Sequence, residues 1–481
     1  MQIFEQFLSN KRFLFLFVAL VAGISIFNWL SESPLAGDDC YYSGVAREMV
    51  RTGDYLTPRS QFGPDFHTSK PPMLYWMNAV SGKIFGFDTF AMRLPSAILG
   101  FLCILALFFF CAKYFNLYFA FIAAITLTFT QQYVYHARSA VTDGPFAVFF
   151  ALSLFAFWIA RTEKNPTFYY LMGFFAGLAI MTRQIPGLFI FCIVFSYIVL
   201  SKEYDIFKNI HFYGAILLTG LIIFPWHITM YIKHGEFFLN QYFRVALMTG
   251  ISGYPESYSS NPSLNPWYGY FSILLSNYWP WLPFFIVGIY KLVKKYFTDD
   301  RQNRAQILFI LLWAFVPFVI FQIAKVKQYH YLVPLYIPFA IITAVTFDSF
   351  AQKLKIKAAF ILSSLVAVLA AAYLFFPIVP KTLDSSDYVK NMMFLSEAKE
   401  IKGDIIALKD WFAYYSNFLW FYADKKVVEN TEAEIKEKVR GKKEYFFIMS
   451  NEVFKGFFTS EEKKKLKTIK QTEESVLFSN I

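Results

Sequence analysis

The chain has 481 residues, of which 57% are hydrophobic and 60 are phenylalanine. Its mean hydropathy of +0.41 gives it more apolar surface than a soluble domain of this length can bury, which excludes the soluble globular class. The net charge of +11 does not indicate a nucleic-acid-binding protein, because the lysines lie in short connections between apolar runs and near the C-terminus, without a compact basic face.

These properties predict a polytopic α-helical membrane protein, since open sheets cannot span lipid. The first apolar run, Phe13 to Leu30, follows Lys11 and Arg12 like a signal peptide, but it is too long and lacks a cleavage site, so we expect a retained span. Apolar length and chain breakers predict about eleven transmembrane helices, with eleven to thirteen compatible with the pattern. The expected spans are residues 12–31, 94–112, 117–135, 145–160, 167–182, 185–201, 211–232, 271–291, 305–324, 331–347 and 358–377.

The distribution of basic residues predicts the orientation of these spans. By the positive-inside tendency, the side that carries the basic short connections is cytoplasmic. The loops 32–93, 136–144 and 233–270 and the C-terminal residues then lie on the opposite, external face, and the N-terminus is cytoplasmic. The basic residues concerned are Lys113, Arg161, Lys164, Lys202, Lys208, Lys291, Lys294, Lys295, Arg301, Arg304, Lys353, Lys355 and Lys357.

The first external loop contains two segments with helical apolar spacing, Tyr41 to Arg51 and Met73 to Phe85. The spacing predicts helices that lie in the membrane interface; small helices in solvent are the alternative.

The composition changes near residue 381, where short β-like runs alternate with helical stretches rich in Lys and Glu. We predict a membrane domain over residues 1–380 and a small soluble α/β domain over residues 381–481. The expected strands are Asp404 to Leu408, Lys426 to Val428, Tyr445 to Met449 and Val476 to Phe478. This segment has no glycine-rich phosphate loop or metal-ligand cluster, so we assign it no chemistry.

Two adjacent acids, Asp38 and Asp39, follow the first span within a few residues, after Pro34 and Gly37. A turn there would hold the carboxylates at the membrane edge, where one can act as a general base toward a hydroxyl group. The alternative is that the acids only end a span in water.

Further charges lie at the same predicted membrane edge. Lys70 precedes Pro71 and Pro72, which restrict the backbone, so we expect its ammonium group to be held in place. A lysine held there can neutralise a phosphate. The alternative is a lysine whose side chain only extends toward the membrane interface. The short turn from His136 to Pro145 carries Arg138 and Asp143, which are candidates for function or for a structural pair with each other.

Arg183 lies at another external span end, and Lys325 and Lys327 stand on the external side against the positive-inside tendency. Such an exception favours an anionic ligand such as a lipid phosphate. We predict no required metal or other cofactor, because no pair of histidines has close helical metal spacing. The histidines considered are His67, His136, His227 and His330. Of the four cysteines only Cys40 lies clearly outside an apolar run, so a disulfide framework is not expected.

The order of these motifs resembles the C-type-fold membrane glycosyltransferases, specifically the protein O-mannosyltransferase and lipid A aminoarabinose transferase superfamily. An acidic pair followed by an aromatic opens the first external loop, a K-P-P-x-x-Y-W segment follows, and then come R-x-P, T-D-G-P, T-R-Q-I-P-G, P-W-H, N-P-W-Y-G-Y and K-x-x-x-Y-x-x-P elements. In this chain they include Asp38, Asp39, Tyr42, Lys70, Tyr75, Arg93, Pro95, Asp143, Arg183, Lys327, Tyr331 and Pro334.

The resemblance implies a polyprenyl-phosphate sugar donor, inversion at the anomeric carbon and Asp38 as the general base, with Asp39 and Asp143 orienting the acceptor or the sugar. It further implies a group of residues that bind the substrate, namely Tyr42, Lys70, Tyr75, Arg138, Arg183, Lys325, Lys327 and Tyr331. The chain departs from the aminoarabinose transferases at Ser69, where they carry an acid, and Asp39 stands in place of the family's usual Glu. The sugar, the acceptor and the choice between the two acids as base therefore stay open.

We thus expect a glycosyltransferase that moves a sugar from a lipid-linked donor to a lipid, glycan or protein acceptor at the periplasmic face. A transporter or flippase of lipid-linked sugars is the rival, but the charges gather at one membrane edge rather than at the midplane. A binding or scaffold role for the C-terminal segment does not explain the charged loops.

Overall fold

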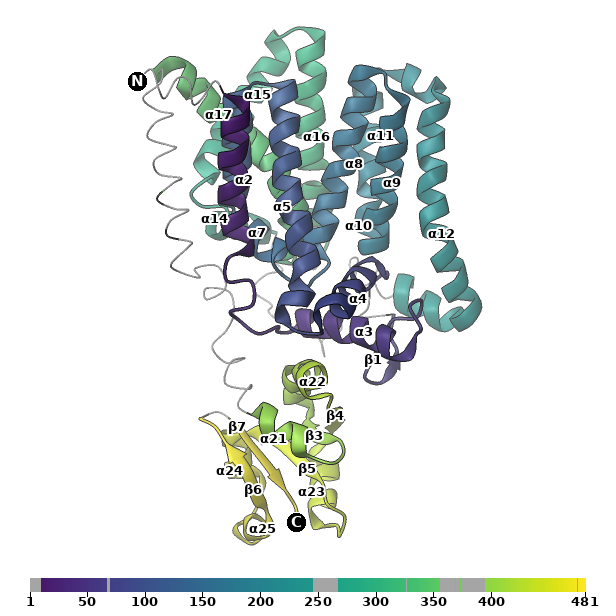
Figure 1. The fold of residues 1–481 in the computed structure, drawn as a ribbon, viewed down its shortest axis with the longest axis vertical. Helices are drawn as coiled ribbons and strands as arrows, with labels where there is room; N and C mark the ends of the chain where they lie inside the picture. The colour runs from purple at the N-terminus through teal and green to yellow at the C-terminus, as the bar shows by residue number, and fades with distance from the viewer. Residues whose placement is uncertain are drawn as a thin grey trace.

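The structure is a computed structural model that describes residues 10–66, 70–244, 267–325, 327–354, 368, 372, 394–473 and 475–481. Long helices run side by side, two shorter helices lie across one end of this bundle, and a sheet with its own helices lies beyond them (Figure 1). The helices of the bundle are α2 (Lys11–Phe27), α5 (Thr89–Tyr114), α6 (Leu117–Thr128), α7 (Gln131–Ala137), α8 (Asp143–Glu163), α9 (Pro166–Thr182), α10 (Gln184–Gly187), α11 (Phe189–Ser201), η1 (Tyr204–Lys208), α12 (Ile210–Leu239), η2 (Asn240–Arg244), α14 (Gly269–Asn277), α15 (Leu282–Thr298), α16 (Arg301–Ile323), η5 (Tyr329–Leu335) and α17 (Tyr336–Leu354).

By length and composition, six helical stretches in the described part of the chain can cross a membrane, or eight if each of two bent pairs forms one span. Helices α2 and α9 have 17 residues each, about 26 Å of helix, which is slightly less than the apolar thickness of a bilayer. The expected span 358–377 lies outside the described residues except for positions 368 and 372. The structure therefore supports a multi-pass membrane protein, and the count of eleven stays a prediction.

Two of the expected spans, 117–135 and 271–291, are each broken into a bent pair of helices. Helices α6 and α7 meet at 70°, and helices α14 and α15 meet at 115°. At the first break the hydroxyls of Thr128 and Thr130 donate to carbonyls one turn earlier, 2.8 and 2.7 Å away, which satisfies backbone groups where the helix ends. At the second break Pro280 has no amide hydrogen to continue the helix.

The two predicted helices of the first external loop are present as α3 (Asp38–Thr52) and α4 (Met73–Phe85). Gly37, with a φ of 51°, allows the turn into α3, and Gly53, with a φ of 73°, ends it in the left-handed conformation. Asp38 and Asp39 occupy the first turn of α3, where the positive end of the helix dipole favours negative charge. A short hairpin, β1 (Arg59–Ser60) with β2 (Gly63–Pro64), lies between the two helices in sequence.

The C-terminal segment forms a five-stranded sheet in the order β4-β3-β5-β7-β6. Strand β3 pairs in parallel with β4 and β5, and β7 pairs antiparallel with β5 and β6. The four expected strands are present, but the edge strand β6 was missed because Ile469 is its only large apolar residue. The elements are α21 (Leu395–Glu400), β3 (Ile405–Leu408), α22 (Lys409–Ala423), β4 (Val427–Asn430), α23 (Glu432–Arg440), β5 (Phe446–Ser450), α24 (Asn451–Phe457), α25 (Ser460–Lys465), β6 (Lys467–Gln471) and β7 (Ser475–Ser479).

The predicted division at residue 380 falls outside the described residues, so the domain boundary and the solubility of the C-terminal segment stay predictions.

Candidate active site

Asp38, the first residue of α3, lies among positive charges from two other segments. The charges of Lys70 and Arg183 both act on its carboxyl group and lower its pKa, but dehydration by the surrounding protein is the larger effect and raises the pKa above its ordinary value. The side chain is nevertheless accessible to solvent. Asp38 is therefore an accessible carboxylate in a poorly hydrated setting, which suits a general base.

Lys70 is held at the start of the segment that leads into α4. Its backbone amide donates a hydrogen bond to the hydroxyl of Tyr75, 2.8 Å away, and Pro71 and Pro72 follow directly. Dehydration and the nearby charge of Arg183 lower the pKa of Lys70 to about 8, against the opposing effect of Asp38. Two cations thus lie close enough to affect one another, an arrangement that an anionic ligand would stabilise.

Arg183 joins three segments of the bundle. It stands between α9 and α10, forms an ion pair with Asp143 at the start of α8, and places its guanidinium 5.0 Å from the centre of the Tyr331 ring in η5. Asp143 therefore pairs with Arg183 and not with Arg138, the partner considered from sequence. The ion pair fixes the orientation of a cation that also acts on Asp38.

Two tyrosines complete this group. The rings of Tyr42 in α3 and Tyr75 in α4 lie 5.8 Å apart. Burial and the charge of Asp38 raise the pKa of Tyr42 well above its ordinary value, so Tyr42 stays protonated and can donate a hydrogen bond. We call Asp38, Tyr42, Lys70, Tyr75, Asp143, Arg183 and Tyr331 the Asp38 cluster.

Asp39 has a different set of neighbours from Asp38. Its carboxylate lies 3.5 Å from the guanidinium of Arg93, and both side chains are buried. Arg93 also donates to the carbonyls of Leu30, Ser33 and Pro34, at 3.0, 2.8 and 3.1 Å. The R-x-P motif identified Arg93 in the sequence but did not indicate its role. In the structure Arg93 holds the loop between the first span and α3.

The chain is similar to known proteins in sequence and in fold. The family described as dolichyl-phosphate-mannose-protein mannosyltransferase matches residues 69–228. An uncharacterized protein of Aquifex aeolicus is 25% identical over 72% of this chain and 65% of its own length. The undecaprenyl phosphate-alpha-4-amino-4-deoxy-L-arabinose arabinosyl transferase 2 of Proteus mirabilis is 29% identical over 67% of this chain and 57% of its own length. This chain thus spans less than two thirds of either relative.

The fold agrees with a solved structure along nearly the whole chain. ArnT from Cupriavidus metallidurans, crystallised with undecaprenyl phosphate, matches with a TM-score of 0.74 and 16% identity over 97% of both chains. In sequence and in fold, the chain is thus similar to members of the protein O-mannosyltransferase and ArnT superfamily of C-type-fold membrane proteins.

The family match covers only part of the Asp38 cluster. Lys70, Tyr75, Asp143 and Arg183 lie within residues 69–228, whereas the residues that α3 and η5 contribute lie outside that range. The tertiary structure brings both sets together.

Three other residues expected to bind substrate have different surroundings. Arg138 donates to the carbonyls of Ser25 and Asn28 in and after α2, at 3.0 and 2.6 Å. Lys327 is buried and donates to the carbonyl of Ala324 at 3.0 Å, and Lys325 is exposed. We therefore leave these three residues out of the proposed site.

The described residues contain no group of three or more His, Cys, Asp and Glu side chains placed to hold a metal ion. The rings of His136 and His330 lie 6.3 Å apart, and Nε2 of His227 lies 2.9 Å from the hydroxyl of Tyr242. His67 lies outside the described residues. The expectation that no metal is required stays a prediction.

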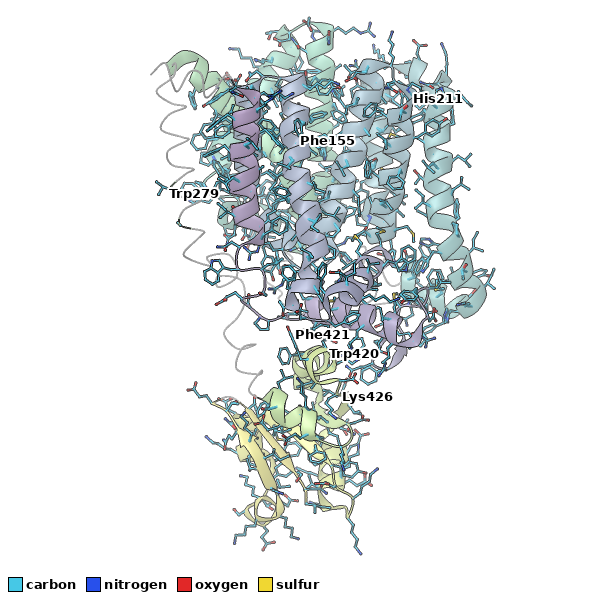
Figure 2. The ribbon with its side chains drawn as sticks, viewed as in Figure 1. Phe155, His211, Trp279, Trp420, Phe421 and Lys426 are labelled. Carbon is cyan, nitrogen blue, oxygen red and sulfur yellow. The ribbon has the colours of Figure 1, made fainter. Side chains whose placement is uncertain are left out.

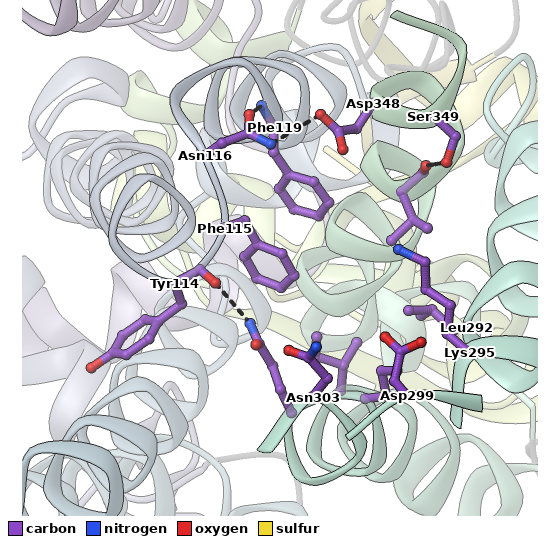
Figure 3. Close-up of a pocket in the computed structure, with 14 residues that line it drawn as sticks. Tyr114, Phe115, Asn116, Phe119, Leu292, Lys295, Asp299, Asn303, Asp348 and Ser349 are labelled. Atoms are coloured by element: carbon purple, nitrogen blue, oxygen red, sulfur yellow. Dashed lines mark hydrogen bonds between the residues drawn. The ribbon is translucent and has the colours of Figure 1, made fainter. Parts of the chain in front are cut away.

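Figure 3 shows a further, polar pocket. Its lining includes Tyr114 at the end of α5, with Lys295, Asp299 and Asp348. Arg93 lies near the start of the same helix, about 32 Å away along its axis. The pocket is thus separate from the Asp38 cluster.

Proposed function

We propose that this protein is an integral membrane glycosyltransferase that moves a sugar from an undecaprenyl-phosphate-linked donor to an acceptor hydroxyl at the periplasmic face of the inner membrane. The observation that carries the proposal is the accessible carboxylate of Asp38 under the combined charges of Lys70 and Arg183. The names of the relatives support a phosphate-linked donor. The sugar can be a pentose or a hexose, and the acceptor a lipid, a glycan or a protein.

The expected reaction is a displacement at the anomeric carbon with inversion. The acceptor oxygen attacks that carbon while Asp38 takes the hydroxyl proton, and the bond between the anomeric carbon and the phosphate oxygen breaks. The electron pair leaves with the lipid phosphate, whose growing negative charge Lys70 and Arg183 stabilise. Asp143 holds Arg183 in place, and Tyr42 and Tyr75 line the site. No step requires a metal ion.

The directions of the helices support a site on the outer face. Helix α8 begins at Asp143 and has Arg161 in its last turn, and helix α5 has Arg93 near its start and Lys113 in its last turn. Asp143 and Arg93 therefore lie at the helix ends opposite the basic connections, and by the positive-inside tendency those connections face the cytoplasm. The same argument supports a cytoplasmic N-terminus and a periplasmic C-terminal sheet.

The test is transfer by the purified full chain in liposomes that contain a synthetic undecaprenyl-phosphate sugar. Mass spectrometry of glycolipids and glycoproteins from cells with and without the gene identifies the sugar and the acceptor to be used. We expect transfer by the parent chain and a loss of transfer in Asp38→Asn. Full activity of Asp38→Asn would contradict the assigned base, and movement of the intact donor across the bilayer without transfer would favour a flippase.

A further inference from the structure

The last turn of α22, which belongs to the C-terminal segment, packs directly against helix α3. Figure 2 shows Trp420 and Phe421 on the side of α22 that faces the membrane bundle. A Cβ atom added at Gly44 in the middle of α3 would lie 2.5 to 2.9 Å from the ring of Trp420, so only glycine allows this approach. The indole is 4% exposed and stands 6.2 Å from the ring of Tyr41.

Arg47 of α3 caps the C-terminal end of α22. Its guanidinium donates to the carbonyls of Trp420 and Phe421, at 2.8 and 2.7 Å, and to Oδ1 of Asp424 at 3.0 Å. The last carbonyls of a helix have no partner within the helix, so this arginine satisfies groups that would otherwise need water.

Tyr422 reaches the segment just before Asp38. Its hydroxyl accepts a hydrogen bond from the amide of Leu35 at 2.7 Å and lies 2.9 Å from the hydroxyl of Thr89 at the start of α5. Leu35 precedes Asp38 by three residues. One hydroxyl thus ties the entry to α3 to the first turn of a transmembrane helix.

Side chains of α22 and of the segment around α3 pack together in two hydrophobic clusters. Leu35 and Cys40 are fully buried in a cluster with Phe418, Leu419 and Phe421 of α22. In a second cluster, Trp420 packs with aromatic residues that include Tyr42 and Tyr75 of the Asp38 cluster. Side chains of α22 are therefore in continuous contact with the residues around Asp38.

We propose that the last turn of α22 is a positioning element for Asp38, in which Trp420 and Tyr422 fix the start of α3 relative to Lys70 and Arg183. This rests on the proposed function, because it assigns Asp38 the role of base. Asp38 begins a helix that packs against α4 and α22, and without α22 Leu35, Cys40 and Gly44 would lose the side chains of α22 that pack against them. The C-terminal segment then contributes to catalysis through the geometry and hydration of one carboxylate.

The first test removes one hydroxyl group from the full chain. In Tyr422→Phe we expect kcat to fall by about tenfold, the effect of one lost hydrogen bond, with an unchanged KM for the donor. Better hydration of Asp38 also moves the acid side of the pH profile to lower pH. Tyr445→Phe, which removes a hydroxyl from the same C-terminal segment, is the matched control and keeps the parent kcat and pH profile.

A second readout does not depend on activity. Cys40 is buried and its thiol donates to the carbonyl of Leu35 at 3.0 Å, so a membrane-impermeant maleimide reaches it only when α22 moves away from α3. The measurement uses a Cys192→Ser background, because Cys192 is exposed, whereas Cys103 and Cys111 are buried in α5. We expect faster labelling of Cys40 in Tyr422→Phe than in Tyr445→Phe.

The second test uses the contact between Gly44 and Trp420. Gly44→Ala forces a methyl group against the indole, and we expect lower kcat and faster labelling of Cys40. In the double variant Gly44→Ala with Trp420→Phe the clashing atoms are removed. We expect this variant to regain part of the lost kcat and part of the slow labelling of Cys40. Gly456→Ala is the matched control, since a Cβ atom there meets nothing within 4 Å.

The outcomes separate the two proposals. An unchanged kcat in both Tyr422→Phe and Gly44→Ala, in a parent chain that transfers sugar, overturns the positioning role whatever the labelling shows. A parent chain that transfers no sugar defeats the proposed function instead, while the labelling still reports whether α22 covers the start of α3.

Discussion

The carboxylate of Asp39 lies 3.5 Å from the guanidinium of Arg93, whereas its neighbour Asp38 is under the charges of Lys70 and Arg183. Two adjacent acids thus have separate partners because successive residues in a helix point about 100° apart. Arg93 also binds three carbonyls of the preceding loop, so Asp39 stabilises the loop that delivers Asp38. This difference supports the proposal that Asp38, and not Asp39, is the base.

The two acids should differ in the effect of the same substitution. Asp38→Asn removes the proton acceptor, and we expect kcat to fall by about 10²- to 10⁴-fold with donor binding retained. Asp39→Asn weakens the contact with Arg93 and should lower the melting temperature with a smaller loss of kcat. Single-turnover transfer and thermal unfolding of both variants check this. A larger loss of kcat in Asp39→Asn than in Asp38→Asn would reverse the assignment.

The pH dependence of kcat/KM should be bell-shaped. Asp38 acts when deprotonated and burial raises its pKa, so activity falls with decreasing pH at values above the ordinary aspartate range of about 4. Lys70 binds phosphate when protonated and its pKa is about 8, so activity also falls as pH rises through about 8. In Lys70→Arg the alkaline fall should move to higher pH, because arginine stays protonated. An unmoved alkaline fall would exclude Lys70 as its source.

The effects of substituting Asp143 and Arg183 on kcat/KM should not be additive. Each single variant, Asp143→Asn or Arg183→Gln, leaves a buried charge without its ion-pair partner, whereas the double variant removes both charges. We expect a coupling free energy of about 0.5 to 3 kcal/mol in kcat/KM from the double-mutant cycle.

The control cycle combines Asp143→Asn with Glu203→Gln, since Glu203 pairs with Arg161 near the other end of α8. Those two effects should add. Additive effects for Asp143 and Arg183 would mean that their ion pair does not organise the site.

Arg138 should affect stability rather than donor binding. Its two guanidinium nitrogens donate to the carbonyls of Ser25 and Asn28, and the single ammonium group of Arg138→Lys cannot reproduce this fork. We expect a loss of about 1 to 3 kcal/mol in the free energy of unfolding, with an unchanged donor KM. A raised donor KM with unchanged stability would return Arg138 to the substrate site.

The sequence predicted α3, α4 and four of the five strands of the C-terminal sheet because their apolar spacing is a local property of the chain. The edge strand β6 and the breaks after α6 and α14 were missed, because an edge strand needs little apolar surface and a bend depends on neighbouring helices. A bilayer confines external loop charges to one thin layer, so the chain order alone indicated that Asp38, Lys70, Asp143 and Arg183 would be neighbours.

By itself the sequence determined the membrane class, the candidate site residues and the superfamily to compare, since hydrophobic length and short motifs are read along the chain. Only the tertiary structure decided which charges pair: Asp143 with Arg183, Asp39 with Arg93, and Arg138 with backbone carbonyls in and just after α2. It also decided that α22, about 370 residues after α3 in the chain, covers the helix that carries Asp38. Ion pairs and hydrogen bonds act over a few ångströms, so their partners follow from folded geometry and not from separation in sequence.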